Sequence, residues 1–146
     1  MPEILQDVAI RRVDLDAEVP EPVLRLLVEL RTNYLDDELL TALRDQAHAL
    51  GYELHAAEVA STPVGLVGFR PVHTLARGRH LHVDDLVVTR DLRGRGIGHR
   101  LLAFVESRAE EASLRAVYLD SPHEVLDFSR RQGYDPHEAV LMRKRL

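Results

Sequence analysis

The sequence predicts an α/β protein with a central mixed β-sheet flanked by helices, in the element order β-α-α-β-β-β-α-β-α-β. Segments with alternating apolar residues predict strands, and segments with apolar residues at every third or fourth position predict helices. Pairs of strands that form hairpins occur together with strand–helix–strand units, and this combination gives a mixed sheet covered by helices. With 146 residues, of which 45% are apolar, residues 1–146 are expected to form one domain.

The first half of the chain contains two helices between strands. Pro20 and Pro22 are typical of a first helical turn, and Asp36 or Asp37 is a candidate N-cap for a second helix that ends at Gly51. A turn sequence, Ser-Thr-Pro, separates the two strands that follow. The expected elements are a strand at 8–13, a helix opened at 20–22, a helix at 38–50, and strands at 52–60 and 64–72.

The second half is built around one transition from strand to helix. An apolar run ends at Val88, a loop with glycines and arginines follows, and apolar residues then recur at Ile97, Leu101, Val105 and Ala109. The expected elements are a strand at 81–88, a helix at 96–113, a strand at 117–120, a helix that starts at 121–122 and ends at 133, and a last strand at 140–142.

The loop between that strand and that helix has the composition of an anion site. Glycines at 94, 96 and 98 let the backbone approach a ligand closely, and the first N–H groups of the helix point outward without a partner. The positive end of the helix dipole lies behind them, so a diphosphate fits there. The spacing excludes a P-loop, which needs a lysine, and a dinucleotide fingerprint, in which the third glycine comes one residue later.

The pattern that remains is Arg-x-x-Gly-x-Gly at Arg93, Gly96 and Gly98, five residues after Val88. It resembles the acetyl-CoA signature of the GCN5-related N-acetyltransferase (GNAT) family. The predicted order of elements agrees with this resemblance over nearly the whole chain. Arg90 stands where the family often has proline, which stiffens the turn.

The resemblance implies how acetyl-CoA binds. In the family, the strands on either side of the signature helix splay apart, and the pantetheine arm of CoA lies in the resulting wedge. The arm would pair with main-chain groups of Leu86, Val87 and Val88, and the pyrophosphate would meet the N–H groups of the signature loop. The residues implied for that loop are Arg93, Gly94, Arg95, Gly96, Ile97 and Gly98.

The implied activity is transfer of an acetyl group from acetyl-CoA to a primary amine, by direct attack in a ternary complex. An alkylammonium has a pKa near 10.4, so a base must accept its proton. His80, His82 and Asp84 alternate with apolar residues and share one predicted face, with Asp85 on the other face unless a bulge changes the register. In the family the base often lies four or six residues before the last valine of this strand. Asp84 and His82 are therefore alternative catalytic bases.

The His-x-His-x-Asp trio at 80–84 is also a pattern of metal ligands. The family chemistry needs no metal, and none is expected.

A weaker match to the family is Phe-Ser-Arg-Arg-Gln-Gly-Tyr at 128–134, which is similar to Phe-Tyr-x-x-x-Gly-Phe. Ser129 stands where the family often has a tyrosine that protonates the departing CoA thiolate, and this position makes it a candidate catalytic residue. A serine hydroxyl is a much weaker acid, so another group or water is the alternative source of the proton.

Two residues are candidates for contact with the acceptor. Tyr34 lies in the helical connection that often covers the acceptor in the resembling family. Asp120 follows a strand at its carboxyl end, where open α/β sheets bind ligands, although it is equally placed to cap the next helix. The expected acceptor is a small-molecule or peptide amine. An acyl-CoA-binding or sensor module without turnover is the alternative function.

The composition narrows the remaining choices. The chain has no cysteine, which excludes disulfides, thiolate metal sites and a cysteine nucleophile. Its formal charge of -5 argues against a nucleic-acid partner, and no apolar run approaches the roughly 18 residues of a membrane span. The N-terminus lacks a signal-peptide core. We therefore expect a cytoplasmic protein without nucleic-acid or membrane partners, and the family resemblance adds the expectation of a homodimer.

Overall fold

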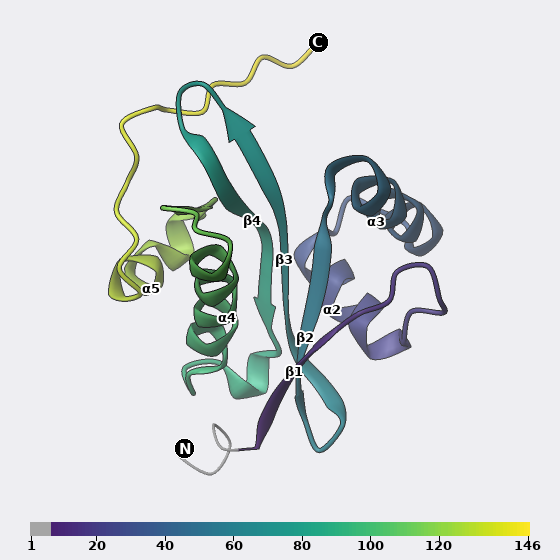
Figure 1. Cartoon of the computed structure of the whole chain (residues 1–146). Helices are drawn as coiled ribbons and strands as arrows, with labels where there is room; N and C mark the ends of the chain where they lie inside the picture. The colour runs from purple at the N-terminus through teal and green to yellow at the C-terminus, as the bar shows by residue number, and fades with distance from the viewer. Residues whose placement is uncertain (1–6) are drawn as a thin grey trace.

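The computed structural model describes residues 7–146 and shows a mixed sheet with helices on both faces (Figure 1). The expected fold class is confirmed. The elements in chain order are β1 (Val8–Arg12), α2 (Glu21–Leu30), α3 (Asp36–Leu50), β2 (Glu53–Val59), β3 (Thr62–Thr74), β4 (Gly78–Val88), α4 (Ile97–Glu111), β5 (Val117–Leu119) and α5 (Leu126–Arg131), with short 3-10 helices at Arg90–Leu92 and His123–Val125.

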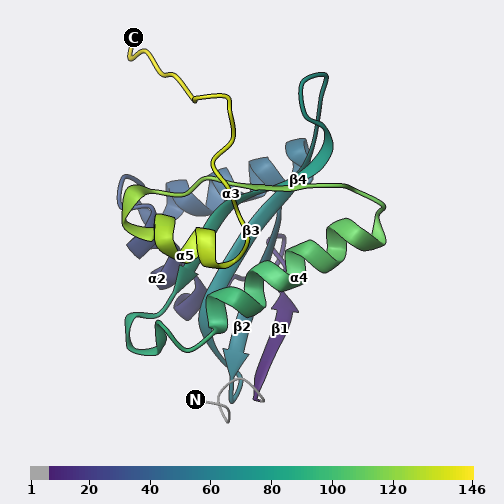
Figure 2. The ribbon, with the colours of Figure 1, turned by 90° about the vertical axis from the view of Figure 1, so that its left-hand side faces the viewer.

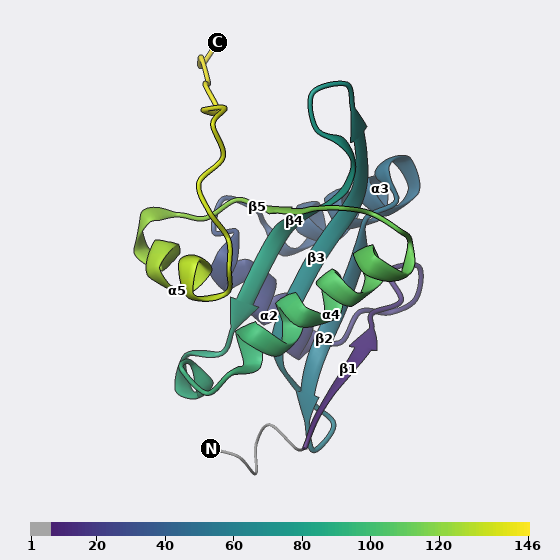
Figure 3. The ribbon, with the colours of Figure 1, turned by 60° about the vertical axis from the view of Figure 1, so that its left-hand side comes forward.

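The sheet has the strand order β1-β2-β3-β4-β5. The first four strands are antiparallel neighbours, and β5 pairs parallel to β4 because α4 carries the chain back across the sheet. The turn between β2 and β3 lies at Ala60 and Ser61, which both have positive φ, so β3 already begins at Thr62. Helices α2 and α3 cover one face, and α4 with α5 covers the other (Figures 1 and 3).

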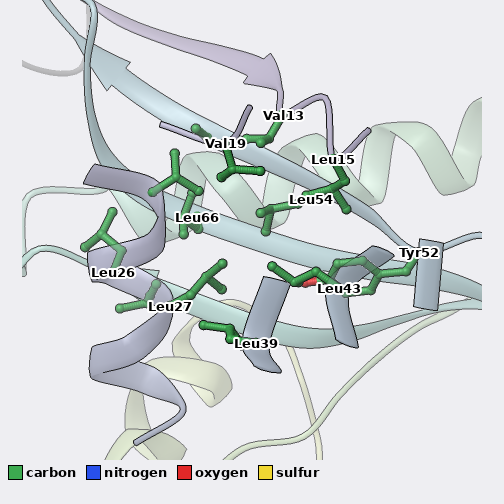
Figure 4. Close-up of a cluster of buried hydrophobic side chains, with 13 residues drawn as sticks. Val13, Leu15, Val19, Leu26, Leu27, Leu39, Leu43, Tyr52, Leu54 and Leu66 are labelled. Atoms are coloured by element: carbon green, nitrogen blue, oxygen red, sulfur yellow. The ribbon is translucent and has the colours of Figure 1, made fainter. Parts of the chain in front are cut away.

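Each face has its own apolar core. Under α2 and α3, side chains from both helices and from β2 and β3 pack around Leu27, Leu54 and Leu66 (Figure 4). On the other face, the predicted stripe of α4 is buried against Val67 and Phe69 of β3. Ile97, Leu101, Val105 and Ala109 are each at most 3% exposed, so the four-residue spacing correctly identified the buried side of this helix.

Two details of the predicted elements are wrong. Helix α3 begins at Asp36 with Leu35 in the N-cap position, so neither Asp36 nor Asp37 is its cap, whereas Gly51 ends it in the left-handed conformation as expected. The predicted last strand at 140–142 does not form. Residues 132–146 contain no helix or strand, and the end of the chain runs away from the body of the protein (Figure 2). No helix among residues 7–146 is long and apolar enough to cross a membrane.

Candidate functional site

Strands β4 and β5 form a wedge. They pair over three positions only, from Leu81 opposite Val117 to Val83 opposite Leu119. Beyond Val83, β4 continues to Val88 along β3, but in the described part of the chain no strand lies on its other edge. The strands thus separate where the resemblance implied, and among the described residues this edge of β4 has no strand partner beyond Val83.

The predicted cofactor residues on β4 alternate between the two faces of the sheet. Val87 is buried in the core under α2 and α3. Leu86 and Val88 are half-buried and pack against the core under α4. Their side chains thus fix the strand in place, while the edge offers only its backbone.

The glycine loop opens directly onto this edge. Gly94 and Gly96 have φ of 76° and 86°, a region in which a side chain is strained. Gly96 is the N-cap of α4, and no side chain caps the helix. The first helical hydrogen bond, from Arg100 N to Gly96 O at 3.0 Å, leaves the preceding N–H groups of the helix without an intrahelical partner. This end of α4 therefore presents main-chain donors and a positive dipole to an anion.

The remaining loop residues hold this geometry in place. Arg93 Nε donates to the carbonyl of Val88 at 3.0 Å and ties the loop to the end of β4, a role that the sequence did not predict. Ile97 is buried under the loop, and Arg95 is half-buried. A Cβ at Gly98 would lie 3.0 Å from Cζ of Phe128, so a glycine there lets α4 pack closely on α5.

A β-bulge interrupts β4 beside the wedge. Gly68 pairs with Asp85 and Phe69 pairs with Val83, so Asp84 is the extra residue. Asp85 consequently lies on the α2–α3 side of the sheet, where it contacts Arg31 and Tyr52. The sequence predicted that Asp85 lies on the face opposite His82 and Asp84 unless a bulge changes the register; the bulge is present, so the exception applies.

His82 is hydrogen-bonded to a carboxylate from the neighbouring strand. Its Nε2 lies 3.0 Å from Oδ2 of Asp120, and 3.9 Å from Oδ1 of Asp84. Asp120 reaches it because His82 is paired with Tyr118 in the parallel register, two residues before Asp120. The alternative role of Asp120 as a helix cap is wrong, because Pro122 occupies the N-cap position of the next helical turn.

Asp84 is held by an arginine. Arg70 donates from Nε to Asp84 Oδ2 at 2.8 Å and from Nη2 to Asp84 Oδ1 at 3.4 Å. Arg70 is the cross-strand partner of His82, so the register of β3 and β4 brings these three polar side chains together. The His82 imidazole, by contrast, is bonded only through Nε2 in the described part of the chain.

Behind Asp84 lies a second polar network. Asp85 is 8% exposed and accepts hydrogen bonds from Arg31 Nε at 2.9 Å and from the Tyr52 hydroxyl at 2.8 Å. Arg31 also donates to the main-chain oxygen of Asp84 at 2.7 Å, which supports the bulge. Burial, followed by the charge of Asp85, raises the pKa of Tyr52 well above its usual value. A Cβ at Gly68 would collide with Tyr52, so only glycine there lets the tyrosine reach Asp85.

A cavity of about 610 Å³ opens from these networks toward α2 and α3. Tyr34 lines it together with Arg70, Asp84 and Asp85, and Tyr34 itself is half-buried. The structure thus brings the predicted acceptor residue Tyr34 and the predicted base Asp84 to one cavity. Helix α3 supplies most of its apolar wall.

His80 is separated from this chemistry. It is 1% exposed, its Nδ1 lies 3.1 Å from the carbonyl of Gly78, and its ring lies 4.5 Å from that of Tyr118. Among residues 7–146, nothing forms a hydrogen bond with its Nε2. Burial lowers the pKa of His80, which favours a neutral imidazole.

A metal at this site would compete with Arg70. One ligand atom each from His82, Asp84 and Asp120 lie within 4.8 Å of one another. However, the guanidinium of Arg70 already neutralises Asp84 at 2.8 Å. His82, Asp84 and Asp120 are therefore better described as members of a hydrogen-bond network than as a set of metal ligands.

Ser129 lies on the far side of the wedge, in α5. It is 4% exposed, and its hydroxyl is hydrogen-bonded to that of Ser121 at 2.7 Å. Its carbonyl accepts a hydrogen bond from Tyr134 N at 3.1 Å. These contacts connect α5 to the end of β5, next to Asp120.

Three site residues were not predicted from the sequence: Arg31, Tyr52 and Arg70. Each reaches the site through contacts between distant parts of the chain, so no motif or residue spacing near it in the sequence identifies it as a site residue. Arg70 alone had a recoverable signal, because a β3–β4 hairpin in the right register would have placed it opposite His82.

The family and structure comparisons agree with one another. The model of the acetyltransferase (GNAT) family matches residues 20–134. A ribosomal-protein-alanine N-acetyltransferase from Brucella melitensis biovar Abortus 2308 is 26% identical, with a TM-score of 0.74 over 95% of this chain and 99% of that chain. The aminoglycoside N-acetyltransferase AAC(6')-Iy, solved with CoA, has a TM-score of 0.79 at 18% identity over 94% of each chain.

A curated relative is much longer. The tRNA(Met) cytidine acetyltransferase TmcA of Aeropyrum pernix is 28% identical in an alignment of 142 positions that covers 83% of this chain and 19% of that protein. The chain therefore spans about a fifth of this relative's length.

Proposed function

Because the chain belongs to the acetyltransferase (GNAT) family, we propose that it transfers an acetyl group from acetyl-CoA to a primary amine. This proposal rests on two main-chain features that lie side by side. One is the N-terminus of α4, which begins after Gly96 without a side-chain cap, and the other is the edge of β4 beyond its short pairing with β5. We propose further that residues 1–146 act as one domain, in which the sheet carries both the cofactor site and the acceptor cavity.

The residues present fit a coenzyme with phosphates at one end and amides along its arm. The N–H groups from Gly94 to Gly98 would bind the pyrophosphate, assisted by the charges of Arg93 and Arg95. The edge of β4 from Leu86 to Val88, where the Val88 carbonyl already accepts a hydrogen bond from Arg93, would pair with the amide groups of the arm. Bound there, acetyl-CoA would supply an activated thioester to the acceptor amine.

His82 is the base that the geometry favours. Because Nε2 faces the carboxylate of Asp120, we assign its proton to Nε2, where it is donated to Asp120. This tautomer leaves the lone pair on Nδ1, which can accept the proton of the ammonium directly or through water. The carboxylate of Asp120 also stabilises the imidazolium that forms.

Asp84 has a different part in the proposal. Its two oxygens are already contacted by Arg70, so it is less available than His82 to take a proton. Each carboxylate oxygen can accept a second hydrogen bond, and through such a bond Asp84 would position the acceptor ammonium near His82. Proton transfer by Asp84 through water is the competing assignment, and separate variants distinguish the two.

The proton for the departing thiolate is proposed to come from water. A thiol has a pKa near 8.5, so the thiolate is a tolerable leaving group. Ser129 is buried and hydrogen-bonded to Ser121, which supports a structural role for its hydroxyl. This part of the proposal replaces the tyrosine chemistry of the resembling family.

The proposed acceptor is a small amine that enters the cavity beside Tyr34 and Asp84. Asp84 and Asp85 line that cavity together with their ion-pair partners Arg70 and Arg31, and its volume of about 610 Å³ suits a small molecule.

A thiol-release assay tests the proposal. The protein is incubated with acetyl-CoA and with amino sugars, polyamines, amino acids or short peptides, and free CoA is measured with a thiol reagent. The chain contains no cysteine, so the protein itself adds no thiol signal. Release that depends on one class of amine supports the enzyme. Tight CoA binding without release from any amine would favour the alternative, an acyl-CoA sensor.

A further inference from the structure

The acceptor cavity, which is the space of about 610 Å³ beside Tyr34 and Asp84, carries both signs of charge in equal number. Among the described side chains that line it, the charged ones are Arg31, Arg70, Asp84 and Asp85. They form two ion pairs, Arg31 with Asp85 at 2.7 Å and Arg70 with Asp84 at 2.8 Å. A polyamine would bring several positive charges to carboxylates that are already paired. A ligand with one charge of each sign complements these pairs better.

Both arginines keep N–H groups that their ion pairs do not use. Arg70 donates to Asp84 from Nε and Nη2, and Arg31 donates from Nε to Asp85 and from Nη2 to the main chain of Asp84. Among the described residues, nothing accepts a hydrogen bond from Nη1 of either guanidinium. The two side chains are 29% and 41% exposed, for Arg70 and Arg31 respectively. The cavity therefore offers a carboxylate two guanidinium groups with unused donors.

We propose that the acceptor is an α-amino acid with an apolar side chain, and that Arg70 binds its carboxylate while its amine is acetylated. The inference rests on the proposed acetyl transfer and names the substrate class for the same cavity. The nitrogen forms a bond to the acetyl carbon and the C–S bond breaks. The products are the N-acetylamino acid, CoA thiol and one proton, which leaves through His82.

The position of Arg70 fits the short distance between the two charges of an α-amino acid. The amine and the carboxylate are attached to one carbon, so the anion site must lie beside the base. Arg70 is the cross-strand partner of His82, and it holds Asp84, whose Oδ1 lies 3.9 Å from His82 Nε2. The ammonium would thus bind to Asp84 and the carboxylate to Arg70, so each charge of the ligand meets the opposite charge of one ion pair.

The side chain of the amino acid would lie on the apolar wall of the cavity. Leu27 of α2 and Leu39 and Leu43 of α3 contribute to this wall and are each at most 4% exposed, so the core holds them in place (Figure 4). Ala42 and Leu50 of α3 line the more exposed part. A charged side chain of the ligand would lose its water there without gaining an unpaired partner, so the wall favours an aliphatic one.

The first test compares three amines that share one carbon skeleton. Leucine carries the carboxylate, leucinamide replaces it with a neutral amide, and 3-methylbutylamine lacks it. The kcat/KM for CoA release should be higher with leucine than with either analogue by roughly tenfold or more, the size expected for a hydrogen bond to a charged group. Amine basicity works against this result, because the carboxylate raises the pKa of the leucine amine. Equal or faster release with leucinamide would overturn the proposal.

Arg70→Gln should remove the preference for leucine over leucinamide. Because Arg70 also holds Asp84, the rates with all amines are expected to fall, and the ratio of kcat/KM between the two substrates is the readout. A general loss of structure lowers both rates alike. Arg70→Lys keeps the charge without the planar fork and should retain part of the preference. Arg79→Gln is the matched control, since Arg79 is exposed on β4 and does not line the cavity. A ratio that Arg70→Gln leaves intact would contradict the assignment of the carboxylate to Arg70.

Binding measurements separate this inference from the acetyl transfer on which it rests. Calorimetry on the CoA-saturated protein gives the affinities for leucine and leucinamide without turnover. CoA release without any preference for leucine, in rate or in affinity, would overturn the amino acid proposal and leave acetyl transfer standing. Tighter binding of leucine without CoA release from any amine would support the amino acid site and overturn acetyl transfer. Neither release nor binding would overturn both.

Discussion

His82 Nε2 lies 3.0 Å from Asp120 Oδ2, which joins β4 to the end of β5 across the wedge. The side chain of His82 is 12% exposed and that of Asp120 is 65% exposed, so the base would sit inside the site while its carboxylate partner stays hydrated. The proposed base and its carboxylate partner thus lie at the point where β4 and β5 separate.

Replacing His82 with alanine should lower kcat by roughly 10²- to 10⁴-fold, the usual contribution of a general base. The affinity for CoA, measured by calorimetry, should change little, since the proposed cofactor contacts are main-chain groups of other residues. His73→Ala on β3 is the control, because His73 is an exposed histidine outside the site. A full rate in His82→Ala would place the base elsewhere.

Asp120→Asn should reduce kcat less than His82→Ala does, and the pH profile of kcat should change with it. The amide can still accept a hydrogen bond from Nε2 but cannot stabilise the imidazolium by charge. Asp120→Glu should restore part of the rate if the carboxylate acts through His82. If Asp120 only contacts the acceptor, KM for the amine would rise instead while the pH profile stays unchanged.

Asp84→Asn should raise KM for the amine more than it lowers kcat, because the proposal gives Asp84 the task of holding the ammonium. Steady-state kinetics with the best amine from the panel separates the two parameters. A collapse of kcat as large as that of His82→Ala, with KM unchanged, would transfer the role of base to Asp84.

Gly96→Val should weaken CoA binding by more than tenfold. Gly96 has φ of 86° at the start of α4, where a β-branched residue is strained and its side chain narrows the approach to the N–H groups. Gly133→Val is a matched control, since Gly133 has φ of 89° and lies after α5. Both variants should lose about 1–2 kcal/mol of stability or more, but only Gly96→Val should lose CoA. Equal CoA affinity in the two variants would refute the phosphate role of the loop.

The protein should become less stable as the pH falls below about 6.5. Burial is the main cause that lowers the pKa of His55 and of His80 below 6.5, so the unfolded chain takes up protons first on acidification. Stability is therefore fully present above 6.5 and decreases toward the lower folded pKa of each group. Each pKa unit of difference is worth about 1.4 kcal/mol.

Glu53 should extend this loss to lower pH. Burial alone would raise the pKa of Glu53, but the hydrogen bond from His55, with Arg108 and Arg12 nearby, lowers it below 4.5 overall. A depressed carboxyl contributes stability above 4.5 that disappears on further acidification. Denaturant unfolding from neutral to acid pH measures the whole curve. His55→Phe should flatten the upper part, and an unchanged slope there would contradict the assignment to His55.

The periodicity of α4 and the glycine spacing before it were readable from the sequence because both are local. Each depends on contacts between residues a few positions apart, which backbone geometry relates directly to side-chain direction. The buried stripe from Ile97 to Ala109 and the left-handed start of the helix at Gly96 therefore agree with the structure. The paired roles of Asp84 and His82 remain a prediction.

What the sequence by itself determined was the fold class, the loop at the start of α4 and the strand that carries the polar side chains. Only the tertiary structure decided which of those side chains meet. The bulge at Asp84 put Asp85 on the α2–α3 side of the sheet, the β3–β4 register placed Arg70 on Asp84, and the short β5 brought Asp120 to His82. In the tertiary structure, residues 140–142 also lack the strand partner that their sequence pattern predicts. The physical reason is that strand pairing is a contact between distant parts of the chain, so one inserted residue or one missing neighbour changes the outcome without any local signal.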